Sequence, residues 1–154
     1  MRSLVRILIC GASVCIAQSS EDSQKQRLSG MQWAHYYATR YGVSFEFVAA
    51  VIDVESAWQP YAVSDKGAVG LMQLMLEAAY GFGVGNRFRT EENIQGGVAY
   101  LAFLIQEFRD LRLVAAAYYA GESRIARVGL KCADPDVTSY VSAVQRAYQN
   151  RIDR

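Results

Sequence analysis

Glu55 is the residue whose type and position best suit acid–base chemistry. It follows Ile52 by three residues and Val48 by seven, so a helix would place it on the same apolar face. It also lies near the C-terminal end of that helix, where the helix dipole is negative. Burial and the dipole both disfavour the ionised form, so its pKa should rise and the carboxyl group could serve as a general acid. On periodicity alone, an exposed glutamate on a misread helix face remains the alternative.

A second carboxylate beside Glu55 is not evident in the sequence. Asp53 lies two residues earlier, and about 200° of helical rotation would point it the opposite way. Asp65 is the nearest acidic residue in the following loop and is a weaker choice. The sequence therefore offers one acid, without the carboxylate pair that most glycosidases use. The single histidine, His35, has no evident partner, and three cysteines with one histidine argue against a zinc site, so we predict no metal and no cofactor.

The helix that carries Glu55 is one of several that apolar periodicity predicts, and no stretch shows the alternation typical of a strand. Ser44 is a suitable N-cap for it and Pro60 stops it. Further start and stop signals are Gly42, Thr90, Gly121 and the pair Asp134-Pro135. We predict an all-α fold with other helices over residues 28–41, 71–80, 90–110, 111–120, 122–129 and 135–150, and a small β-hairpin within 60–70 as the one candidate for paired strands.

The N-terminal segment has the pattern of a secretory signal peptide. Arg2 and Arg6 precede a run of apolar or small residues that ends at Ala17, and polar residues follow. We predict a signal peptide over residues 1–17, a flexible lead over 18–28 and one domain over 29–150. An uncleaved anchor or a buried helix is the alternative, although the run is short for a membrane span. Cleavage would leave a chain without a membrane span, in the periplasm or outside the cell.

The composition fits one globular domain with an ordinary core. The chain has 154 residues, of which 52% are hydrophobic and 20% charged. With 16 basic and 15 acidic residues the formal net charge is +1, which gives no broad basic surface. We therefore expect no nucleic-acid partner.

The segment from Glu55 onward carries a distinctive series of motifs. Glu55-Ser56 is followed by Pro60, and then by Ser64-x-x-Gly67-Ala68-x-Gly70-Leu71-Met72-Gln73-x-Met75. Three further blocks come in order: Glu92-Asn93-Ile94 with Gly97 and Tyr100-Leu101, then the run from Ala117 to Gly121, then Tyr140-Val141. Over residues 44–148 this pattern closely resembles the soluble lytic transglycosylases of glycoside hydrolase family 23.

The resemblance implies a lysozyme-like fold and an activity on peptidoglycan. Members cleave the β-1,4 bond between N-acetylmuramic acid and N-acetylglucosamine, leaving a 1,6-anhydro end and using no water. Glu55 would be the general acid and then the base. The N-acetyl group of the substrate would stabilise the positive C1, which would explain the missing second carboxylate. Ser64, Gln73, Met75, Tyr118 and Tyr140 match positions that line the family cleft. The Tyr118 hydroxyl would hydrogen-bond Glu55 or the sugar.

One departure from the family pattern concerns the cleft directly. Tyr119 stands where the family has asparagine, and its ring would either narrow or reshape the cleft or face a different direction. Two alternatives remain: a hydrolytic muramidase in which Asp65 positions water, and a peptidoglycan-binding or assembly protein with weak turnover. By analogy with other small transglycosylases, the partners would be peptidoglycan glycan strands and components of a conjugation or secretion machine.

Overall fold

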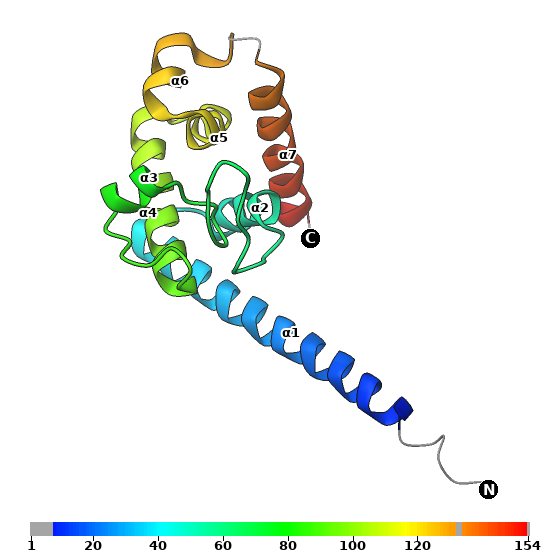
Figure 1. Cartoon of the computed structure of the whole chain (residues 1–154). Coiled ribbons are helices and arrows are strands. Elements are labelled where there is room, and N and C mark those ends of the chain that lie inside the picture. Colours follow the sequence, from blue (N-terminus) through cyan, green and yellow to red (C-terminus); the bar gives the residue numbers. More distant parts are fainter. Residues whose placement is uncertain (1–7, 132–133, 154) are drawn as a thin grey trace, which may run out of the picture.

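The computed structural model describes residues 8–131 and 134–153, and within these ranges every regular element is helical (Figure 1). This confirms the predicted all-α class. The elements are α1 (Leu8–Tyr41), α2 (Phe45–Glu55), α3 (Leu76–Gly81), α4 (Thr90–Phe108), α5 (Leu111–Ala120), α6 (Glu122–Val128), the 3₁₀ helix η1 (Gly129–Lys131) and α7 (Pro135–Ile152).

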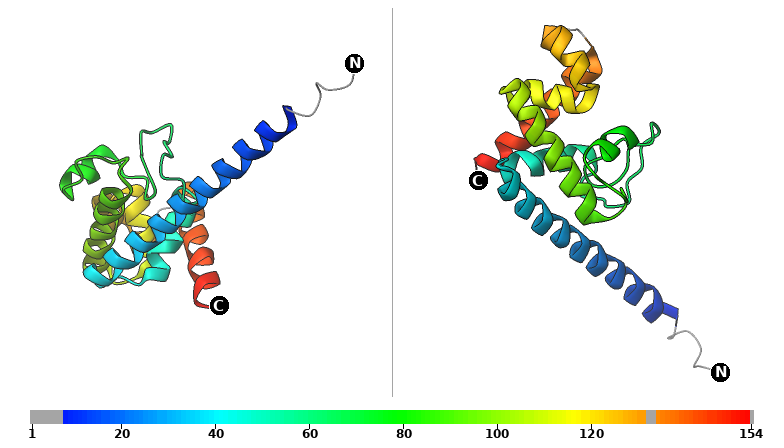
Figure 2. Two further views of the ribbon diagram at one scale, coloured as in Figure 1. Left: turned by 90° about the horizontal axis from the view of Figure 1, so that it is seen from below. Right: turned by 90° about the vertical axis from the view of Figure 1, so that its left-hand side faces the viewer.

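The first part of α1 extends away from the rest of the molecule as a single rod, and its last part packs against α4 and α2 (Figures 1 and 2). Residues 18–28 are helical and form part of α1, and the flexibility predicted for this lead stays a prediction. Side chains 21–28 are exposed, and a polar, solvated segment can be helix as well as coil. The proposed cleavage after Ala17 falls inside α1 and stays a prediction, and residues 1–7 lie outside the described residues.

The short helix α2 lies in the core and carries Glu55 as its last residue. The Ser44 hydroxyl accepts a hydrogen bond from the Phe47 backbone N–H at 3.2 Å, which confirms the predicted N-cap. Val48 and Ile52 are fully buried, as the apolar stripe predicted. α7 packs against α2, and α5 packs against α7 and α4 (Figure 2). Helix packing thus brings side chains of α5 and α7 towards the end of α2.

Between α2 and α3 the chain forms an irregular loop, residues 56–75. The predicted helix over 71–80 is wrong in its first half, because only Leu76–Gly81 is helical. Gly70 has φ +82° and Gln73 φ +46°, values that a right-handed helix cannot include. In place of the predicted hairpin, the structure has two isolated antiparallel bridges, Val63 to Val69 and Val69 to Leu74, which do not extend into strands.

The remaining helix ends follow the sequence signals with one exception. Gly121, with φ +93°, ends α5, and the Asp134 carboxylate accepts the backbone N–H two residues later while Pro135 opens α7. Thr90, predicted as a cap, is instead the first residue of α4, and Arg89 precedes it without a side-chain cap. None of the helices in the described part of the chain is long and apolar enough to cross a membrane.

Candidate active site

Glu55 is partly buried at the C-terminal end of α2. Burial raises the pKa of its carboxyl group from 4.5 to about 7, and the hydrogen bond from Tyr140 opposes this rise. The group can therefore hold a proton near neutral pH and release it with little change in pH. This is the property that the sequence predicted for Glu55, and it suits a general acid that later acts as a base.

Tyr140, on α7, is the hydrogen-bond partner of this carboxyl group. Its hydroxyl donates to Oε1 of Glu55 at 2.5 Å, across 85 residues of sequence. The ring is only 9% exposed, and burial together with the Glu55 charge raises the pKa of Tyr140 well above its usual value. Tyr140 therefore stays a hydroxyl donor at any pH at which Glu55 titrates, and it favours the carboxylate form of Glu55.

Asp53 faces away from Glu55, as the helical rotation predicted, and it has a structural partner. The Arg151 guanidinium donates to its two carboxylate oxygens at 2.8 and 2.9 Å, and the Trp58 indole N–H donates at 2.6 Å. These bonds tie the end of α7 and the start of the loop to α2. Sequence reasoning missed the pair, since 98 residues separate its members and no local pattern marks it.

Tyr118, on α5, is oriented differently from the prediction. Its hydroxyl donates to the Met72 backbone carbonyl at 2.7 Å, and not to Glu55. Burial is the largest cause that raises its pKa well above the usual value, and the charge of Glu55 adds to this rise, so the two side chains are close enough to interact. Tyr118 thus links α5 to the loop beside Glu55, and a sugar contact stays a prediction.

The loop is held by further side-chain bonds to its backbone. Ser56 donates to the Leu71 carbonyl at 2.8 Å. Asn93 of α4, 1% exposed, accepts the Met72 N–H at 2.8 Å and donates to the carbonyls of Val69 and Arg87 at 2.8 and 2.9 Å. Asn93 was noted only as part of a motif. Its role could not be read from local sequence, because its partners lie up to 24 residues away.

Ser64 and Gln73 use part of their hydrogen-bonding capacity to shape this loop. The Ser64 hydroxyl accepts the Ala68 N–H at 3.0 Å, and the Gln73 amide donates to the carbonyls of Ala62 and Gly70 at 3.0 and 2.9 Å. Met75, at the end of the loop, is 47% exposed. Their predicted contacts with a substrate stay predictions, although all three side chains face one cavity.

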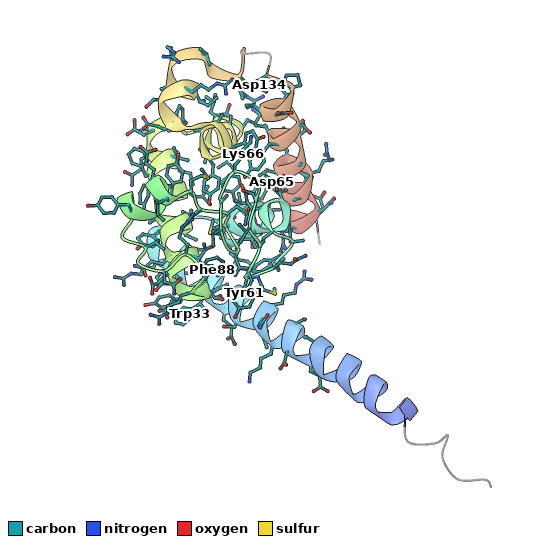
Figure 3. The ribbon with its side chains drawn as sticks, in the orientation of Figure 1. Trp33, Tyr61, Asp65, Lys66, Phe88 and Asp134 are labelled. Atoms are coloured by element: carbon teal, nitrogen blue, oxygen red, sulfur yellow. The ribbon has the colours of Figure 1, made fainter. Side chains whose placement is uncertain are left out.

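That cavity has a volume of about 580 Å³ and brings the predicted residues together. It is lined by Glu55, Ser64, Gln73, Met75 and Tyr118, together with Tyr119 and the charged residues Asp65, Lys66, Arg124, Asp134 and Asp136. Figure 3 shows Asp65, Lys66 and Asp134 on the same side of the molecule. Tyr140 is not among the lining residues, because it lies against Glu55 behind the surface of the cavity.

A second cavity of about 560 Å³ adjoins the first. The two share Gln73, Met75, Tyr118, Tyr119, Ala120 and Arg124, and the second continues to the aromatic residues Phe82, Tyr100 and Phe103. Together they make a cleft with an acidic and polar part around Glu55 and an aromatic part beyond it. In the described part of the chain, no three His, Cys, Asp or Glu side chains are grouped to hold a metal ion.

Comparison with known proteins identifies the family. The profile of the family described as Transglycosylase SLT domain matches residues 32–137, more than half of the chain. The chain belongs to this family. Its match to the 70-kDa soluble lytic transglycosylase of Escherichia coli has a TM-score of 0.69 at 26% identity and covers 78% of this chain and 23% of that one. The lysozyme-like fold that the resemblance implied is thereby confirmed.

Two curated relatives cover shorter stretches. Membrane-bound lytic murein transglycosylase F of Desulfosudis oleivorans is 47% identical over 74 residues, 48% of this chain and 16% of the relative. The transglycosylase of enterobacteria phage PRD1 is 34% identical over 87 residues, 56% of this chain and 33% of the relative. The chain thus spans between about a sixth and a third of these relatives.

Proposed function

We propose that this chain is a peptidoglycan lytic transglycosylase with Glu55 as its catalytic acid and base. The observation that supports the proposal best is the state of Glu55: burial raises its pKa to about 7, Tyr140 binds it, and it faces a cavity in the cleft. Membership in the SLT family and the names of the relatives support the same activity.

In the first step, protonated Glu55 gives its proton to the glycosidic oxygen between N-acetylmuramic acid and N-acetylglucosamine. The C1–O bond breaks, and positive charge develops at C1. The Tyr140 hydroxyl donates to the carboxylate that remains, so it stabilises the group at the moment when it becomes charged.

In the second step, the Glu55 carboxylate removes the proton of the muramic acid O6 hydroxyl, and O6 bonds to C1. The product is a 1,6-anhydro ring, and Glu55 is protonated again by the proton from O6, while the proton that it gave in the first step stays on the leaving hydroxyl. No water enters, so no second carboxylate is needed to activate one. In this assignment four further residues line the path of the glycan: Ser64, Gln73, Met75 and Tyr118. Their polar groups would hydrogen-bond the N-acetyl and peptide amides of the substrate, and Met75 would pack against the face of a sugar ring.

The test is mass spectrometry of purified sacculi digested with the purified chain. We expect anhydro-muropeptides from the wild type and a loss of about 10²–10⁴-fold with Glu55→Gln. Glu107→Gln, on the exposed side of α4, is the matched control and should act as the wild type. A full-rate Glu55→Gln variant would remove Glu55 from the chemistry.

The alternative function with a specific observation in its favour is hydrolysis. Asp65 lines the same cavity as Glu55 and could position a water molecule. The same digestion separates the two, because a hydrolase leaves reducing ends in place of anhydro ends. A folded chain without products of either kind would favour the binding or assembly protein.

We further propose that the chain is exported by a signal peptide over residues 1–17 and acts in the periplasm or outside the cell. The match to cell-envelope murein enzymes supports an envelope location. Intact-mass measurement of the exported protein should show a chain that begins at Gln18. A protein that retains Met1 after export would favour the uncleaved anchor.

We also propose that the chain works with a conjugation or secretion machine, which must open the cell wall locally. The likeness to the phage transglycosylase is compatible with such a role. Cross-linking in intact cells, followed by purification of the chain, should recover components of an envelope-spanning assembly. Recovery of the chain alone would count against this partner.

A further inference from the structure

Tyr119 and Tyr140 form a stacked pair next to Glu55. Their ring centroids lie 4.7 Å apart at an interplanar angle of 24°, with Tyr119 on α5 and Tyr140 on α7. Tyr140 is the residue whose hydroxyl donates to Glu55. The residue that departs from the family pattern therefore stacks on a side chain that binds the proposed acid.

The two rings differ in their contact with solvent. Tyr119 is 41% exposed and lines both cavities of the cleft, whereas Tyr140 is 9% exposed and lines neither. Tyr119 thus forms the outer layer of the stack, and Tyr140 the inner layer. An asparagine in place of Tyr119 is too small to cover the face of an aromatic ring.

We propose that Tyr119 covers the Tyr140 ring and limits the access of water to the hydrogen bond between Tyr140 and Glu55. The consequence for catalysis rests on the proposed function of Glu55. The consequence for the protonation state of Glu55 rests only on the geometry of the two rings and the hydrogen bond.

The other charged and titratable groups near Glu55 come from several elements, and a substitution at Tyr119 alters none of these residues. Tyr118 of α5 is close enough for the charge of Glu55 to act on it, and its hydroxyl donates a hydrogen bond to the Met72 carbonyl. Asp65 and Lys66 of the loop and Asp136 of α7 line the same cavity. Arg124 of α6 and Asp134 also line it and pair with each other at 2.8 Å. Variants at position 119 change none of these charges. A shift in the pKa of Glu55 therefore reports on how well the stacked rings shield its carboxyl group from water.

The experiment is a pH titration of the Glu55 carboxyl carbon by ¹³C NMR in the full chain, with Glu55→Gln to assign the signal. The wild type should titrate near pH 7. Tyr119→Asn should lower this pKa by about one unit, because Glu55, which already lines the cavity, then loses the cover of the stacked rings and is better solvated. Tyr119→Phe keeps the ring and should titrate as the wild type. Tyr140→Phe removes the hydrogen bond that favours the carboxylate and should shift the pKa upward.

Opposite shifts for Tyr119→Asn and Tyr140→Phe, with no shift for Tyr119→Phe, would support the proposal. An unchanged pKa in a folded Tyr119→Asn variant would overturn it. If that variant does not fold, Tyr119→Ser gives the same test, because its side chain is too small to cover the Tyr140 ring.

Digestion of sacculi over a pH series gives a second, separate readout. Loss of activity at high pH should begin about one unit lower for Tyr119→Asn than for the wild type. If even the wild type releases no anhydro ends, the proposed function fails, and the NMR titration still decides the role of Tyr119.

Discussion

The two sides of the cleft are held in different ways. On the α2–α7 side, packed helices carry Glu55 and Tyr140, and a single hydrogen bond joins the two residues. On the opposite side, the loop of residues 56–75 has no regular structure, and its backbone is bound by side chains such as Asn93 and Tyr118. The helical side sets the charge state of the acid, and the loop side sets the shape of the cleft. Substitutions on the two sides should therefore have separable effects.

The largest effect on stability is expected at Asn93. Its side chain satisfies one backbone N–H and two carbonyls, and it is 1% exposed. Asn93→Leu leaves these groups without partners in the interior, so we expect a loss of about 3 kcal/mol or more in the free energy of unfolding. Urea denaturation measures it.

Asn150→Ala, on an exposed face of α7, is the matched control and should change stability by less than about 0.5 kcal/mol. If Asn93→Leu were as stable as this control, the loop would be held by its apolar contacts and not by hydrogen bonds.

The second effect lies on the helical side and depends on pH. Below pH 4.5 Glu55 is protonated in both the folded and the unfolded chain, and its folded pKa is about 7. The contribution of protonated Glu55 to the free energy of unfolding is therefore fully present below pH 4.5. It is lost as the pH rises towards 7, because in this range Glu55 ionises in the unfolded chain but stays protonated in the folded chain. At about 1.4 kcal/mol per pK unit, the loss reaches about 3 kcal/mol.

Glu55→Gln cannot ionise and still offers an oxygen to Tyr140. It should be more stable than the wild type by up to about 3 kcal/mol at pH 8 and equal to it at pH 4. Thermal unfolding at the two pH values gives the comparison. A gain of the same size at both would mean that burial does not raise the pKa of Glu55.

Local sequence patterns predicted the helical side better than the loop side. The spacing of Val48, Ile52 and Glu55 gave the buried face of α2, and Ser44 gave its start, because both signals act within a few residues. The loop was mistaken for a helix over 71–75, since an apolar run does not reveal the positive φ of Gln73. The Tyr118 bond to Met72 and the Asn93 bonds join distant segments, which periodicity cannot detect. Likewise, the motifs pointed to Tyr140 but not to its stacking on Tyr119.

The third effect concerns the pair that ties the end of α7 to α2. Arg151→Met removes two charge-assisted hydrogen bonds to Asp53. The Asp53 carboxylate still accepts the hydrogen bond from the Trp58 indole N–H. The pair is partly exposed to solvent, so we expect a loss of about 1–2 kcal/mol in the free energy of unfolding. Arg146→Met, on the exposed face of α7, is the control.

In contrast to Glu55→Gln, Arg151→Met should leave the pH dependence of activity in place, because Tyr140 lies in the second turn of α7 and Arg151 in its last turn. A shifted pH dependence would show that the end of α7 also positions Tyr140.

The smallest effect is expected at Tyr118, where the two sides meet. Tyr118→Phe removes the hydroxyl that binds the Met72 carbonyl and keeps the ring. We expect a loss of about 1 kcal/mol in stability and, as the loop loosens, a higher KM with little change in kcat. The pH at which activity is lost should stay near the wild-type value, because this hydroxyl donates to the loop and not to Glu55. If that pH moves, the Tyr118 hydroxyl acts on Glu55 during turnover, and the division between a helical side that sets charge and a loop side that sets shape fails at this residue.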